Sequence, residues 1–102
     1  MTRYQTDVAT AHASRYLQQL CKHWSHRLEV AFDATQGVVR FDGATCNLRA
    51  AADRLHVTLE SDDLALATTL CGVVADHLKR FAFREDLGFD WTEVPVQAGA
   101  ER

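Results

Sequence analysis

The residues best suited to chemistry lie close together, in the stretch LCKHWSHR of residues 20–27. Cys21, His23 and His26 carry the sulfur and imidazole donors that bind zinc, copper and iron. His23 and His26 are three residues apart, so on one helix they face the same side and could share a metal ion. Cys21 lies about 140° or more from both around an ideal helix, so it joins them only if the helix ends near residue 24. The spacing matches no standard zinc motif, and the simpler interpretation is the end of an amphipathic helix.

A third imidazole extends this candidate site. His77 flanks the apolar face of another predicted helix, and it approaches His23 if the two helices pack side by side. His23, His26, His77 and Cys21 are therefore predicted ligands of a transition metal, iron, zinc or copper. Alternatively, His23 or His77 acts as the general base of an enzyme in a cleft between the helices. A third alternative makes them boundary residues, hydrogen-bonded to their neighbours, in a dimeric scaffold with no small-molecule site.

The first predicted helix is also unusual in its charge. No acidic residue occurs from Val8 to Leu28. We predict a face that binds a ligand or a partner on the exposed side of this helix and just after it. It consists of Arg15, Lys22, His26 and Arg27. Such a face would engage an anion or an acidic partner, and His26 would make that contact sensitive to pH. A solvated helix face is the simpler alternative.

Composition excludes several function classes. The 102 residues are 47% hydrophobic, 25% charged and carry a net charge of −3, which is typical of one globular domain and not of a basic nucleic-acid-binding protein. No apolar run reaches the ~18 residues that span a bilayer, and the first ten residues show no secretory signal. We therefore expect a cytoplasmic protein whose partners are neither nucleic acid nor membrane.

Other patterns give no enzymatic signal. The motifs GxSxG, GxGxxG and HExxH and the phosphate-binding P-loop are all absent. The three cysteines, Cys21, Cys46 and Cys71, include no CxxC pair, and all fall on apolar faces. They are predicted to be reduced, buried thiols.

Hydrophobic periodicity predicts the elements that hold these residues. Period-two alternation predicts strands over residues 3–9, 27–32, 38–42, 45–50, 55–61 and 87–91, and helical spacing predicts helices over 11–25 and from about 62 to 83. Thr10 and the run 61–63 are expected to cap the helices, Gly37 to end a turn, and Asp42 and Gly43 to form a tight hairpin turn.

The order β-α-β-β-β-β-α-β predicts an α+β two-layer sandwich. Its antiparallel sheet of five to six strands is covered on one face by both helices. The domain is expected to span residues 1–94, with a flexible tail over 95–102. Leu64 is expected on the inner face of the second helix and His56 on the solvent-facing side of the sheet. Leu66 and Val73 are expected to point outward, where they could form the seam of a homodimer.

Two long strings resemble a known family. ASRYLQQLCKHWSHRLEV and VVADHLKRFAFREDLGFDW are similar to a small bacterial family called domain of unknown function 2218. The resemblance implies no activity and no catalytic residues. It implies an association with siderophore-interacting flavin reductases, and so favours an accessory or binding protein in metal or siderophore handling, with such a flavoprotein as partner.

Overall fold

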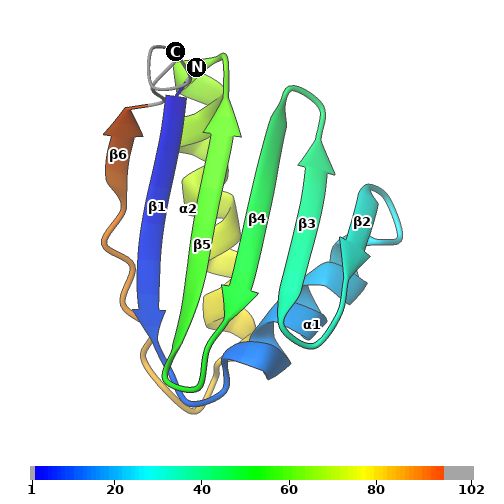
Figure 1. Ribbon diagram of the computed structural model, residues 1–102, viewed down its shortest axis with the longest axis vertical. Coiled ribbons are helices and arrows are strands. Elements are labelled where there is room, and N and C mark those ends of the chain that lie inside the picture. The colour runs from blue at the N-terminus through cyan, green and yellow to red at the C-terminus, as the bar shows by residue number, and fades with distance from the viewer. Residues whose placement is uncertain (1, 96–102) are drawn as a thin grey trace, which may run out of the picture.

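The computed structural model describes residues 2–95 and is an α+β two-layer sandwich (Figure 1). A six-stranded, wholly antiparallel sheet has the strand order β2-β3-β4-β5-β1-β6. Both helices lie on the same face of this sheet, as predicted. The elements are β1 (Thr2–Ala9), α1 (Ala13–Trp24), β2 (Glu29–Phe32), β3 (Gln36–Phe41), β4 (Ala44–Ala50), β5 (Arg54–Ser61), α2 (Leu64–Phe81) and β6 (Thr92–Pro95).

Alternation along each strand decides which side chains enter the core. On β5, Leu55, Val57 and Leu59 are fully buried beneath the helices, whereas the residues between them point to the opposite face. The first and last strands of the described chain, β1 and β6, pair with each other. At the β3–β4 hairpin, Gly43 has a φ of 88°, a conformation that favours glycine, and its carbonyl accepts a hydrogen bond from the Ser61 hydroxyl at 2.7 Å. The predicted hairpin turn is therefore confirmed.

Each helix buries one apolar face against the sheet. α1 presents Tyr16, Leu17, Leu20, Cys21 and Trp24 to β2, β3, β4 and β5, and α2 covers β5 and β1. The α2 cap is confirmed, because the Asp63 side chain accepts a hydrogen bond from the Leu66 amide. The prediction that Thr10 caps α1 is wrong. His12 holds that position without a side-chain bond, and Thr10 instead accepts the His12 amide in the turn before the helix.

Gly37 was predicted to end a turn, but it lies inside β3. A Cβ atom at this residue would stand 2.7 Å from the Cys21 sulfur and 3.4 Å from a Leu17 methyl carbon. The sheet therefore needs a residue without a side chain at the point where the Cys21 sulfur of α1 meets it.

The C-terminal part of the prediction needs further correction. Residues 87–91 form no strand. They are an extended segment that packs Leu87, Phe89 and Trp91 on the core, and the Asp90 amide donates to the Thr6 hydroxyl at 3.1 Å. The last strand is β6, which follows that segment.

The second helix also differs from its prediction. It ends at Phe81, and Leu64 in its first turn is 55% exposed, because the apolar stripe turns away from the sheet there. Leu66 and Val73 are partly buried against the core, so they provide no outward seam, and a homodimer stays a prediction. The predicted tail lies outside the described residues except for Pro95, which ends β6. Within residues 2–95, neither helix has the length and apolar character needed to cross a membrane.

Candidate functional site

The two helices bring His23 and His77 together, as the sequence predicted. The centroids of their rings are 5.3 Å apart, and the ring planes are inclined by 46°. Trp24 lies 5.0 Å from the His77 ring on one side, and Phe81 lies 6.1 Å from the His23 ring on the other. The pair therefore sits in an aromatic contact between the C-terminal end of α1 and the last turns of α2.

One backbone hydrogen bond orients His77. Its Nδ1 lies 2.8 Å from the carbonyl oxygen of Val73, one turn earlier in α2. A carbonyl only accepts, so Nδ1 donates its proton to it, and Nε2 is the ring nitrogen that remains for a ligand. His23 is exposed and His77 half-buried, so the pair borders solvent. A fixed tautomer with a free nitrogen suits a metal ligand or a general base.

The other predicted ligands stay apart from this pair. Cys21 is fully buried against Gly37, and burial raises the pKa of its thiol to about 11, so no thiolate is present at neutral pH. His26 is exposed in the turn after α1 and makes no hydrogen bond or ring contact with any described residue. Among residues 2–95, no three His, Cys, Asp or Glu side chains lie close enough to hold one metal ion. The pair would supply two donors, and water or a bound molecule the remainder.

All three cysteines are buried and free, which confirms the prediction of buried thiols. Burial raises the pKa of Cys71 to about 11. Burial, together with the nearby Cys21 and Cys71, raises the pKa of Cys46 even further. These thiols act as small apolar groups of the core.

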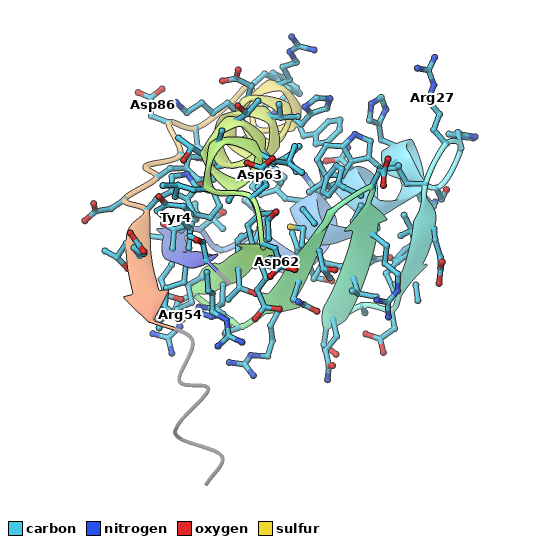
Figure 2. All side chains as sticks on the ribbon, turned by 90° about the horizontal axis from the view of Figure 1, so that it is seen from above. Tyr4, Arg27, Arg54, Asp62, Asp63 and Asp86 are labelled. Atoms are coloured by element: carbon cyan, nitrogen blue, oxygen red, sulfur yellow. The ribbon has the colours of Figure 1, made fainter. Side chains whose placement is uncertain are left out.

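The predicted basic face is accessible. Arg15, Lys22, His26 and Arg27 are all exposed, and in the described part of the chain none forms an ion pair. Figure 2 shows Arg27 extending away from the body of the molecule.

Glu85, in the loop after α2, has a structural role. Its carboxylate accepts hydrogen bonds from the Tyr16 and Thr10 hydroxyls, which joins this loop to the beginning of α1. The Tyr16 hydrogen bond is the main cause that holds the pKa of Glu85 below its ordinary value. Burial, and then Glu85, raise the pKa of Tyr16.

The face of the sheet that the helices leave uncovered contains two pockets that sequence reasoning missed. The larger pocket, about 750 Å³, crosses the sheet from β1 to β2, and the smaller pocket, about 290 Å³, adjoins it. Arg49 and His56 line both pockets. His56 is on this face as predicted, but it is half-buried, and its Nδ1 lies 2.6 Å from the Asp7 carboxylate. The sequence signal for these pockets was the row of polar residues that alternate with the core residues of β4 and β5. In the sequence, this row looks the same as ordinary solvent-facing positions of a strand.

Comparison with known proteins supports the fold and the family. No curated protein matches the chain. The NMR structure of PA4090 from Pseudomonas aeruginosa is similar to it, with 38% sequence identity and a TM-score of 0.78 over 90% of this chain and 96% of that one. A family model described as "Uncharacterized protein conserved in bacteria (DUF2218)" matches residues 5–92. The chain therefore belongs to this uncharacterised bacterial family.

Proposed function

We propose that the chain is a small cytoplasmic binding protein, not an enzyme, that takes a transition-metal ion at His23 and His77 as part of metal or siderophore handling. The observation that carries this proposal is the 5.3 Å separation of the two rings, with Nδ1 of His77 bonded to the Val73 carbonyl. Metal-binding histidines commonly donate their second ring nitrogen to a carbonyl in this way. Imidazole donors suit zinc, copper and iron alike.

Two protein donors leave coordination positions open. An ion held only by His23 and His77 would keep water in those positions, so a chelating molecule could supply the remaining donors. A protein that handles metal complexes needs this kind of incomplete site. The family resemblance to companions of siderophore-interacting flavin reductases favours iron as the metal.

The first experiment is elemental analysis of protein purified without chelators, followed by titration with Fe(II), Zn(II) and Cu(I). We expect one ion per chain, with binding lost in His23→Ala and in His77→Ala. The matched control is His12→Ala, which removes an imidazole about 16 Å away along α1, given the helical rise per residue. Binding that survives in His77→Ala, or that is lost in His12→Ala, would refute the assignment. If both variants lose turnover of a substrate and the protein binds no metal, the general-base alternative is correct instead.

The basic face of α1 supports a second function, the docking of an acidic partner. Arg15, Lys22 and Arg27 are exposed without ion pairs in the described residues, and no acid from Val8 to Leu28 offsets their charge. A siderophore-interacting flavoprotein is the partner that the resemblance suggests. Lys22→Glu should weaken binding of such a flavoprotein at low salt at least threefold, because it reverses one charge at the contact. The control is Arg80→Glu on α2, and equal weakening in both variants would exclude a specific face.

A further inference from the structure

The uncovered face of the sheet is a layer of polar side chains in register. On it, Arg49 of β4 pairs with His56 of β5, and Asn47 pairs with Thr58. Val38 of β3 stands opposite Asn47 on the other side. These five residues line the larger pocket, so hydrogen-bonding groups and a small apolar area lie side by side within it.

Several charged side chains on this face already have a partner. Arg3 bonds to Glu60 across β1 and β5, and Arg40 lies 3.4 Å from Glu29. The Asp7 carboxylate accepts a hydrogen bond from Nδ1 of His56. Arg49 and Arg54 are left over, because their guanidinium groups form no ion pair or hydrogen bond with any residue between 2 and 95. One carboxylate, Asp33, also lines the larger pocket, where it accepts hydrogen bonds from the Thr35 and Gln36 amides.

The two unpaired guanidinium groups lie at the same place. Arg49 and Arg54 both line the smaller pocket, and Arg49 also borders the larger one. Figure 2 shows Arg54 on the side of the sheet that faces away from α2. His56 stands between the pockets with its ring orientation set by the hydrogen bond to Asp7, since a carboxylate accepts the Nδ1 proton. The site therefore combines two unpaired guanidinium groups with the uncharged polar side chains of Asn47 and Thr58, and the Asp33 carboxylate borders the same pocket.

We propose that this face binds a small organic molecule that carries a carboxylate or phosphate group. The oxyanion is held by Arg49 with Arg54 beside it, and the body of the molecule lies over Asn47, Thr58 and Val38. A guanidinium donates two parallel hydrogen bonds to either kind of oxyanion, which makes arginine the preferred residue for this task. The volume of about 750 Å³ is within the ordinary range for small-molecule sites.

Charge on this face argues against a nucleic acid as the occupant. Recognition of a phosphate backbone needs many unpaired cations along a continuous strip. Here Asp7, Asp33, Glu29 and Glu60 interrupt the strip, and within residues 2–95 this face has two unpaired arginines. The site is also separate from the His23–His77 pair, which the sheet divides from it, so each proposal can fail without the other.

The test is an NMR titration of ¹⁵N-labelled full-length protein with benzoate, phenyl phosphate and benzamide. Benzamide has the shape of benzoate without its charge. We expect saturable shifts of β3, β4 and β5 amides with benzoate or phenyl phosphate, and the stronger of the two identifies the oxyanion. Benzamide should bind at least tenfold more weakly. Arg49→Gln should weaken binding of the oxyanion probe at least tenfold. The control is Arg40→Gln, which changes an exposed arginine of the same face outside both pockets and should leave that affinity unchanged.

Several results would overturn the proposal. The first is the absence of a saturable shift with either oxyanion, and the second is equal affinity for benzoate and benzamide. The others are an equal loss of affinity in Arg49→Gln and Arg40→Gln, and shifts that are confined to the helices. Saturable binding of a short DNA duplex at this face, tighter than either oxyanion, would assign it to nucleic acid instead. Arg49 is exposed, so its replacement should leave the fold intact, and the spectrum of the variant reports this directly.

Discussion

The contact between Gly37 and Cys21 allows a sharp test of how α1 sits on the sheet. A Cβ atom on Gly37 would stand 2.7 Å from the Cys21 sulfur, closer than real Cβ atoms approach anything. Both residues are buried, and Gly37 does not have a positive φ, so the β3 backbone accepts alanine without strain. Any destabilisation by Gly37→Ala therefore comes from overpacking against α1.

The size of the effect follows from two opposing terms. Overpacking a core by a methyl group costs about 1–3 kcal/mol. Replacing glycine by alanine in a compatible conformation stabilises by about 0.4–1 kcal/mol through the unfolded chain. We expect Gly37→Ala to lower the free energy of unfolding by about 1–2 kcal/mol. When Cys21→Ala has removed the sulfur, the nearest remaining atoms lie at 3.4 Å, so Gly37→Ala should then be close to neutral.

A double-mutant cycle measures this coupling. Urea denaturation of the parent chain, the two single variants and the double variant gives four free energies of unfolding. A coupling of about 1–3 kcal/mol, with the double variant more stable than the two single effects predict, supports the packing described here. If Gly37→Ala destabilises both backgrounds equally, Cys21 is not the obstructing group. If it destabilises neither, α1 does not lie this close to β3.

Two further predictions concern the ends of the helices. Because Glu85 has a pKa below the ordinary 4.5 in the folded chain, its stabilising contribution is complete above that value and is lost as the pH falls through the folded-state pKa. Glu85→Gln should therefore lower the Tm at neutral pH and flatten its acid dependence below about pH 4.5, and an unchanged acid profile would contradict the role of this carboxylate. Asp63→Ala removes the α2 cap and should cost about 0.5–2 kcal/mol by urea denaturation. Asp76→Ala, exposed in the same helix, is the control, and an equal loss there would exclude capping as the cause.

Hydrophobic alternation was enough to predict the sheet, because five of its strands have one face in the core. β5 shows this most clearly, since its leucines and valine are buried while the intervening residues are not. The same signal failed at residues 87–91, where Leu87, Phe89 and Trp91 also alternate. A segment that packs extended along a core needs the same alternation as a strand, and only a free sheet edge makes it one. β6 pairs with Thr2–Gln5 of β1, whereas the segment before it bonds to the next residue of β1 through the Thr6 hydroxyl and forms no ladder with that strand.

The approach of His23 to His77 was predictable for a similar reason. Each flanks the apolar stripe of a helix, and two helices on one sheet face bring their flanks together. Cys21 stays apart from that pair because α1 remains helical through Trp24. The place where α1 crosses β3 depends instead on Gly37, which leaves room for the Cys21 sulfur. Local spacing contains no information about such a crossing.

The pocket beside Arg49 could not be predicted from local spacing at all. Which arginine is left unpaired on the open face depends on which strands are neighbours, and β1 joins β5 across 57 residues between Arg3 and Glu60 and 49 residues between Asp7 and His56. If β1 lay elsewhere in the sheet, Glu60 and Asp7 would have other partners, and Arg49 would stand beside a different set of charges. The strand order thus turns an ordinary row of mixed charges into a face with two uncompensated cations at one end. For this reason, the residues that could bind a ligand emerge only from the topology, although each of them was visible in the sequence as a polar position of a strand.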